Sequence, residues 1–280
     1  MGETAPSYKD CLHLGEDTAM ATVVFVHAHP DDEALLTAGT MRALKERGYR
    51  VLVVLATNGE AGLTDDAHSF NLASLRKSEY EKSAKLLGVE QTYFLNYKDS
   101  GLAATSDSTA FCNTDLNEIA EVLAAILRNE NAQLVIGYDQ KGGYGHPDHI
   151  QVHKAVIAAS KIAGTPVVAN ATVNRQMIAK LLDYLRPAMK FGPLKDLASL
   201  ADGFTPQADI THIIDISRWT GVKRASMRVH GSQRVGGSTI RTLQLFSNLP
   251  STIFNRAFKY EWYQVLTENG ENPLNDLPQK

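Results

Sequence analysis

The chain has 280 residues, 44% of them hydrophobic, and a formal net charge of −3. This length suits one large domain with a substantial buried core. The slight acidic excess and the lack of a polybasic block exclude a general nucleic-acid binder and an electrostatically held membrane protein, because both need clustered Lys and Arg. The N-terminal residues lack a signal-peptide core and the two cysteines imply no disulfide framework, so we expect a cytoplasmic protein.

Apolar runs and amphipathic segments alternate through the first two thirds of the chain. Strands are predicted at Thr22–Ala28, Arg50–Ala56, Thr92–Leu95 and Gln133–Tyr138. Helices are predicted at Glu33–Arg47, Asn71–Leu87, Asp115–Arg128 and Pro147–Ile162. This alternation predicts a Rossmann-like α/β fold, with a mostly parallel sheet and helices on both faces.

The pattern weakens after about residue 165. We predict a helix, a strand and a further helix, at Val173–Leu185, Thr211–Ile216 and Trp219–Val229. Residues 1–165 are therefore interpreted as a Rossmann-like domain, and residues 166–280 as a smaller C-terminal lobe packed on the same core, so that we expect one continuous domain. The last segment, Glu271–Lys280, is expected to be loosely held.

The first chemical signal is the run His29-Pro30-Asp31-Asp32-Glu33, between the first predicted strand and the first helix. Two neighbouring carboxylates in a dry pocket need a cation or hydrogen bonds to remain ionised. A metal ion would meet that need. Acidic residues are also common in the first turn of a helix, so helix capping is the favoured interpretation of Asp31-Asp32-Glu33 alone, and the preceding His29-Pro30 weakens it.

The second signal is Gly145-His146-Pro147-Asp148-His149, which lies between the fourth predicted strand and the next helix. Loops after the strands of a parallel sheet gather at one edge, so the two His-Pro motifs are expected to converge. His29, one Asp of the pair and His149 would supply the three ligands of a catalytic zinc site. A surface histidine is the alternative for His149 alone, and His153 fits a solvated helix face better than a fourth ligand.

Together these motifs resemble those of the PIG-L/LmbE-type deacetylases, a family that includes the GlcNAc-phosphatidylinositol deacetylase. Four further segments fit the family pattern: Asn58–Gly62, Arg76–Glu79, Tyr97–Gly101 and His230–Gln233. The first and third of these lie in the long predicted loops Thr57–Phe70 and Asn96–Thr114. Loops of such length usually build a site or are mobile.

The resemblance implies three metal ligands, His29, Asp32 and His149. It also implies that Asp31 is the general base that takes a proton from water. Spacing does not tell which of Asp31 and Asp32 binds the metal, and this assignment rests on the resemblance. Zn²⁺ is the expected ion, and Fe²⁺ fits the same ligands.

The resemblance implies four further roles. Tyr144 and His146 would stabilise the oxyanion or protonate the departing amine, while Arg76 and Asp99 would contact the substrate. An Arg on a helix is more often on a solvated face, and an Asp before Ser-Gly commonly makes a turn.

The sequence thus predicts a zinc-dependent hydrolase that deacetylates a small N-acetylglucosamine-type sugar or glycoconjugate, with water attacking the amide carbonyl. An amidase of a larger thiol-sugar conjugate would use the same site. A non-haem iron oxygenase and a non-catalytic binding module are alternatives from other classes. No G-x-G-x-x-G, P-loop or G-x-S-x-G motif is present. A homo-oligomer is compatible with the sequence, which does not require one.

Overall fold

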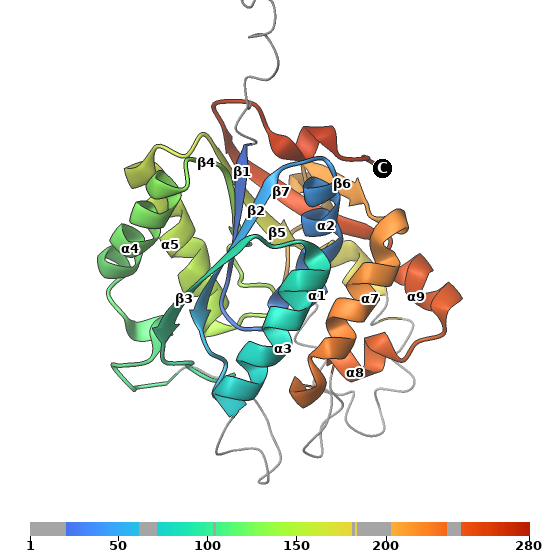
Figure 1. The fold of residues 1–280 in the computed structure, drawn as a ribbon, viewed down its shortest axis with the longest axis horizontal. Coiled ribbons are helices and arrows are strands. Elements are labelled where there is room, and N and C mark those ends of the chain that lie inside the picture. Colours follow the sequence, from blue (N-terminus) through green and yellow to red (C-terminus); the bar gives the residue numbers. More distant parts are fainter. Residues whose placement is uncertain (1–20, 62–71, 103–104, 181–182, 184–202, 234–241) are drawn as a thin grey trace, which may run out of the picture.

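The computed structural model describes residues 21–61, 72–102, 105–180, 183, 203–233 and 242–280. One seven-stranded sheet lies at its centre, in the order β3-β2-β1-β4-β5-β7-β6 (Figure 1). The strands are β1 (Thr22–His27), β2 (Arg50–Thr57), β3 (Gln91–Tyr97), β4 (Ala132–Tyr138), β5 (Val167–Thr172), β6 (His212–Asp215) and β7 (Tyr260–Glu268). Strands β1 to β5 pair in parallel, and β7 is antiparallel to both β5 and β6. The predicted mostly parallel α/β sheet is confirmed.

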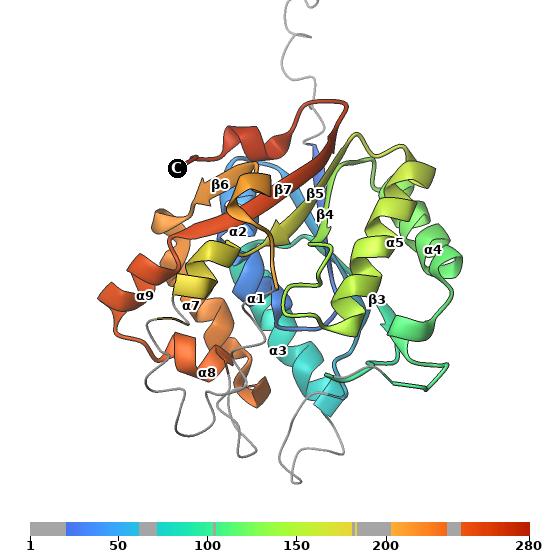
Figure 2. The same cartoon turned by 180° about the vertical axis from the view of Figure 1, so that it is seen from behind.

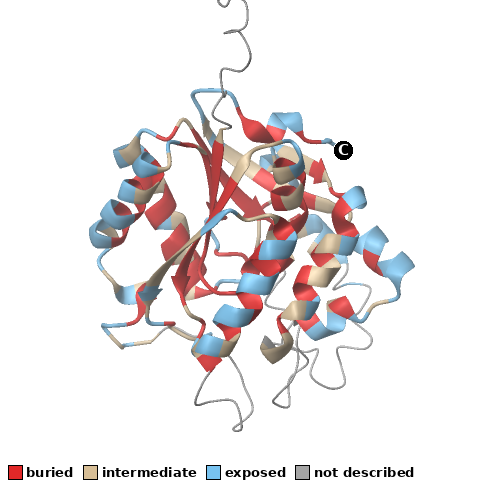
Figure 3. Ribbon diagram, in the orientation of Figure 1, coloured by how far each residue is buried: buried red, intermediate tan, exposed pale blue. Residues whose placement is uncertain are grey.

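Helices cover both faces of this sheet, as predicted (Figures 1 and 2). They are α1 (Asp32–Leu36), α2 (Ala38–Glu46), α3 (Leu72–Leu87), α4 (Leu116–Asn129), α5 (Pro147–Ala163), α7 (Thr220–Val229), α8 (Thr242–Ser247) and α9 (Ser251–Ala257). Alternate residues of β1 enter two cores, so that Val23 and Phe25 pack towards α2 and α3 while Val24 and Val26 pack towards α4 and α5. Both faces of the central strands are therefore buried (Figure 3). In the described part of the chain, no helix is long and apolar enough to cross a membrane.

The helix predicted over Glu33–Arg47 is divided at Thr37 into α1 and α2. Thr37 has φ −131° and ψ 1°, and its hydroxyl lies 3.1 Å from His27 Nε2. The break creates a second helix N-terminus, where the backbone N–H groups of Gly39 and Thr40 donate to the buried Glu261 carboxylate over 2.9 and 2.8 Å. An anion at this position satisfies the exposed donors of the first turn of α2.

The C-terminal third joins the same sheet. The predicted strand and helix at Thr211–Ile216 and Trp219–Val229 are found as β6 and α7, whereas β5 and β7 were not predicted. Of the helix predicted over Val173–Leu185, residues 175–180 are helical and the C-terminal end mostly lies outside the described residues. Strands from both sides of residue 165 belong to one sheet. The division of the chain at that residue stays a prediction.

The expectation that Glu271–Lys280 is loosely held is wrong. Leu274 and Leu277 are buried in the core that also contains β1. The backbone N–H of Lys280 donates to Ile213 O over 2.9 Å, so the chain end is bound along β6. Burial of two leucines outweighs the polar composition on which the expectation rested.

Candidate metal centre and active site

The two His-Pro motifs meet at the edge of neighbouring strands. β1 and β4 are hydrogen-bonded to each other, and the chain places β2 and β3 on one side of them and β5 on the other. Such a switch point opens a crevice at the carboxyl ends of the strands, where ligands of α/β proteins bind. His29 follows β1, and its ring centre lies 4.6 Å from that of His146 and 5.4 Å from that of His149. The structure therefore brings the predicted motifs together.

Two of the three predicted metal ligands, His29 and His149, lie beside a carboxylate oxygen of the third, Asp32. Asp32 Oδ2 lies 3.3 Å from His29 Nδ1 and 3.4 Å from His149 Nε2, and all three residues are buried. His149 Nε2 makes no hydrogen bond, although buried polar atoms are nearly always paired. An unpaired imidazole nitrogen beside a carboxylate suits a cation, and two imidazoles with one carboxylate match a catalytic zinc site.

Two more carboxylates increase the negative charge of this cluster. His29 Nε2 lies 3.2 Å from Asp148 Oδ2 and 3.5 Å from Asp99 Oδ1. Burial by itself lowers the pKa of His29, but its hydrogen bonds to Asp148 and Asp32 outweigh burial and hold that pKa well above the usual value. Ligand atoms of His29, Asp99 and Asp148 lie within 4.8 Å of one another, as do those of His29 and the two histidines of the second motif. The cluster can therefore hold a metal ion.

Asp31 has a different environment from its neighbour Asp32. Its backbone has φ 133° and ψ −22°, a region that residues other than glycine rarely occupy and that costs of order 1–3 kcal/mol. Three contacts hold Asp31 there. Its N–H donates to Glu33 Oε2 over 2.9 Å. Arg76 Nη2 lies 3.1 Å from Asp31 Oδ1 and donates to the preceding carbonyl, Pro30 O, over 2.7 Å. Such strain characterises functional sites.

The electrostatics of the two aspartates also diverge. Burial raises the pKa of Asp31 to about 6, and the charge of Arg76 limits that rise. For Asp32, burial is outweighed by His149 and His29, which hold its pKa well below the usual range. Neighbouring carboxylates with opposite shifts are suited to different tasks, one to exchange a proton and the other to remain charged.

His146 and Tyr144 complete the cluster of aromatic rings around His149. His146 is the N-cap of α5, and its Nδ1 accepts the backbone N–H of Asp148 over 3.2 Å, which leaves Nε2 as its hydrogen-bond donor. Burial and the charge of His29 lower the pKa of His146 to about 4. Tyr144 is 46% exposed, and its ring centre lies 5.9 Å from that of His146. Tyr144 therefore extends from the buried cluster to the solvent, whereas His146 is itself buried.

Arg76 does not lie on a solvated helix face, since it is only 2% exposed. Besides Pro30 O and Asp31, its guanidinium donates to Gly59 O over 2.6 Å. Gly59 has φ +69°, and a Cβ atom there would lie 2.2 Å from Arg76 Nη1, so only glycine allows this approach. Asp99 makes the turn expected of it, accepting Gly101 N–H over 2.8 Å, and also faces His29.

Sequence reasoning missed Tyr138, the last residue of β4. Its hydroxyl accepts the N–H of Ala28 over 2.8 Å and donates to Asp32 Oδ2 over 2.6 Å, and its ring stacks on His149 at 4.1 Å. A Tyr at the carboxyl end of a buried strand was the available signal, because its hydroxyl must find a partner inside the protein. Asp148 and Glu33 were also missed as contacts, although both stand within the quoted motifs.

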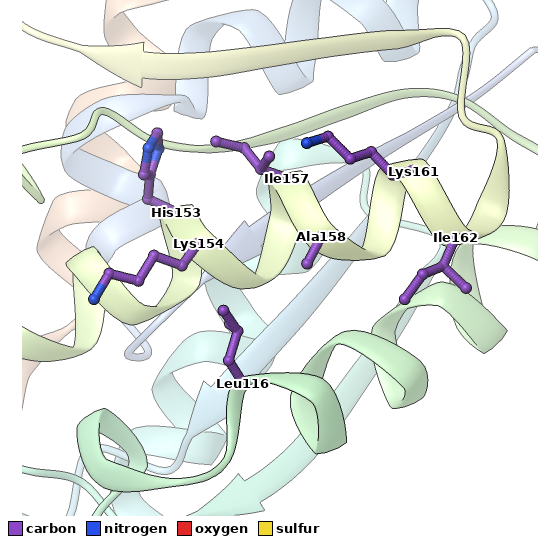
Figure 4. A pocket seen from close by; sticks show the side chains of 7 residues that line it. All are labelled: Leu116, His153, Lys154, Ile157, Ala158, Lys161 and Ile162. Atoms are coloured by element: carbon purple, nitrogen blue, oxygen red, sulfur yellow. The ribbon is translucent and has the colours of Figure 1, made fainter.

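His153 lies away from the cluster. Its Nδ1 is 2.9 Å from Tyr138 O, and its side chain lines a surface groove of about 490 Å³ on α5, together with Lys154 and Ile157 (Figure 4). None of the clustered histidines or aspartates lines this groove. This groove is thus separate from the cluster of histidines and aspartates that follows β1 and β4.

Fold and site together define an α/β protein with a buried His–carboxylate metal-binding cluster at its topological switch point. The profile of the PIG-L family, described as GlcNAc-PI de-N-acetylase, matches residues 24–160. A 1D-myo-inositol 2-acetamido-2-deoxy-alpha-D-glucopyranoside deacetylase of Acidothermus cellulolyticus is 34% identical over 91% of this chain and 94% of its own length. The chain belongs to the PIG-L family. The predicted family and the predicted enzyme class, a deacetylase, are confirmed.

Solved structures share the fold at lower identity. The N,N'-diacetylchitobiose deacetylase of Pyrococcus horikoshii aligns with a TM-score of 0.60 and 21% identity, over 95% of both chains. GalB of Pseudomonas putida, a 4-carboxy-2-hydroxymuconate hydratase, aligns with a TM-score of 0.55 and 17% identity, over 90% of this chain and 99% of its own. Since the same fold occurs in a hydratase, the fold alone does not determine the reaction, which depends on the residues of the site.

Proposed function

We propose that this protein is a zinc-dependent N-deacetylase of a small glycoside that carries an N-acetylglucosamine group. One observation carries the proposal: Asp32 Oδ2 lies 3.3 Å from His29 Nδ1 and 3.4 Å from His149 Nε2, a nitrogen that makes no hydrogen bond. Two imidazoles and one carboxylate are the ligand set expected of a catalytic zinc site. The relatives named above support the substrate class, because the Acidothermus enzyme acts on a glycoside of that kind.

His29, Asp32 and His149 would hold the ion. A bound zinc ion polarises the amide carbonyl and lowers the pKa of water. Asp32 suits the role of ligand because contacts with His29 and His149 keep it charged, and the hydroxyl of Tyr138 fixes its orientation. Hydrogen bonds of this kind to a liganding carboxylate raise metal affinity.

Asp31 would take the proton from the attacking water. Its side chain is partly exposed beside the ligands, and its pKa of about 6 lies close to the pH at which a general base works best. Arg76 keeps the carboxylate in place over 3.1 Å. Loss of a positioned general base typically reduces the rate by about 10²–10⁴-fold.

His146 and Tyr144 would stabilise the charge that develops during the reaction. The oxyanion that forms on the amide carbonyl needs donors, and both His146 Nε2–H and the Tyr144 hydroxyl are available for that task. The departing amine needs a proton, and the proton that Asp31 takes from water would balance this demand. His146, whose pKa of about 4 keeps the ring neutral, would donate its Nε2–H as a hydrogen bond to the reacting group. Asp99, held by the N–H groups of Ala61 and Gly101, would contact sugar hydroxyls.

The test is metal content and acetate release in one sample. Purified protein is dialysed, reloaded with Zn²⁺ or Fe²⁺, and offered GlcNAc-inositol, N,N'-diacetylchitobiose and free N-acetylglucosamine. The proposal predicts about one bound ion per chain, on a three-ligand site, and chelator-sensitive release of acetate from at least one glycoside. A protein that binds no ion after reloading contradicts it. Bound ion with activity only on larger acylated conjugates would overturn the substrate class and keep the site.

A further inference from the structure

We propose that His230 is a positioning residue for Asp31, and that it acts through the buried carboxylate of Glu33. The inference rests on the proposed role of Asp31 as general base. His230 lies just after α7 and is 197 residues from Glu33 in the chain. None of the metal-site roles proposed above uses it.

Glu33 connects His230 to the backbone of Asp31. Its Oε1 lies 2.6 Å from His230 Nε2 and accepts the Ser83 hydroxyl, also over 2.6 Å. Its Oε2 accepts the N–H of Asp31 over 2.9 Å. Glu33, Ser83 and His230 are completely buried, so water cannot replace any of these partners. The orientation of the carboxylate is therefore set by three protein donors.

Asp31 depends on that orientation because its backbone is strained. At φ 133° the peptide relaxes unless its neighbours hold it. Arg76 fixes Pro30 O and the Asp31 carboxylate, and Glu33 fixes the Asp31 N–H. If His230 is lost, Glu33 keeps only Ser83 on Oε1 and is free to turn. A displacement of about 1 Å in a catalytic group can reduce turnover about 10²-fold.

The segment that carries His230 is itself fastened to α3. The backbone N–H and the hydroxyl of Ser232 donate to the Glu79 carboxylate over 2.8 and 2.6 Å. Glu79 lies one helical turn after Arg76 on α3. The same helix therefore carries Arg76, which contacts the Asp31 carboxylate, and Glu79, which binds the segment containing His230. This arrangement gives the His230–Gln233 motif a task that is distinct from metal binding.

Two amide substitutions differ by one methylene and separate positioning from packing. In His230→Gln, the amide nitrogen reaches the place of Nε2 and can donate to Glu33, whereas in His230→Asn it falls short. We expect His230→Asn to lower kcat about 10²-fold, with KM and bound metal per chain unchanged. His230→Gln should recover most of that loss. Ser83→Ala removes the other donor to Glu33 Oε1 and should lower kcat in the same way, which keeps the test available if the His230 variants do not fold.

Met227→Ala is the matched control. Met227 is also completely buried, one turn earlier on α7, and packs in an apolar cluster with Ala34, Leu243 and Phe254. The Met227→Ala substitution should lower thermal stability and leave kcat unchanged. If His230→Asn and Ser83→Ala lose no more turnover than Met227→Ala, or if His230→Asn loses the metal, the inference is wrong. If Asp31→Ala keeps full turnover, the proposed function itself fails, so the two failures are distinguishable.

Discussion

The Tyr138 hydroxyl donates to Asp32 Oδ2 over 2.6 Å, while the same ring stacks on His149 at an interplanar angle of 9°. One side chain from the end of β4 therefore touches two of the three proposed ligands, which come from different motifs. The Ala28 N–H, which donates to the same hydroxyl, ties this contact to the end of β1. The geometry of the centre is thus built into the pairing of the two strands.

This relationship predicts the behaviour of Tyr138→Phe. The ring still stacks on His149, but Asp32 loses a donor and the Ala28 N–H loses its acceptor. Zinc affinity should fall about 10–100-fold, and the unpaired N–H should lower the free energy of unfolding by about 1–3 kcal/mol. Metal titration and denaturant unfolding of the metal-free protein measure the two effects.

Tyr80→Phe is the control for that experiment. Tyr80 is equally buried, and its hydroxyl lies 3.0 Å from that of Thr92, on the α3 side of the sheet. It should lower stability and leave zinc affinity unchanged. Equal zinc affinity in Tyr138→Phe and the wild type would remove Tyr138 from the account of the metal site.

The two aspartates of the first motif should respond differently to amide substitution. Asp31→Asn should keep the metal and lose turnover by about 10²–10⁴-fold, as expected for a general base. Asp32→Asn should lose metal affinity, because the amide brings no negative charge to His29 and His149. Metal analysis and kcat of both variants decide the matter. Metal loss confined to Asp31→Asn would mean that the two roles are exchanged.

Gly59→Ala should disturb Asp31 from a distance. The added Cβ would lie 2.2 Å from Arg76 Nη1, so the guanidinium must leave its place beside Asp31. Turnover should fall, and the strained backbone should lower stability by about 1 kcal/mol or more. Gly164→Ala has a similar φ, +74°, with no atom within 4 Å of its Cβ. It should show the loss of stability alone, and an equal loss of turnover in both variants would contradict the role of Arg76.

The C-terminal segment should contribute to stability. Leu274 is completely buried in the core beside β1, so Leu274→Ala should lower the free energy of unfolding by about 2–5 kcal/mol. Leu266→Ala, at a site that is 40% exposed on β7, should change it much less. Denaturant unfolding of both variants is the measurement. If the two variants are equally stable, the segment does not pack as described.

The sequence predicts the part of the site that depends on the order of strands, motifs and helices along the chain. Each His-Pro motif stands between a buried strand and a helix, which is enough to place both at one sheet edge. The pairing of β5 with β7 joins segments distant in the chain, and β7 alternates polar and apolar residues without a strong signal, so neither strand was predicted. The contact of His230 with Glu33 likewise requires the folded chain. The assignment of Asp31 and Asp32 to different roles came from the family resemblance, and their contrasting contacts with Arg76 and Tyr138 become visible only in three dimensions.

The central claim is that His29, Asp32 and His149 form the metal site of a deacetylase, and the most direct test is metal content with acetate release in the wild type and in His149→Ala. We predict about one ion per wild-type chain and acetate release from an N-acetylglucosamine glycoside that stops on chelation and returns with Zn²⁺. His149→Ala should lose both bound metal and turnover. Full acetate release by a metal-free wild type, or by His149→Ala, would contradict the account.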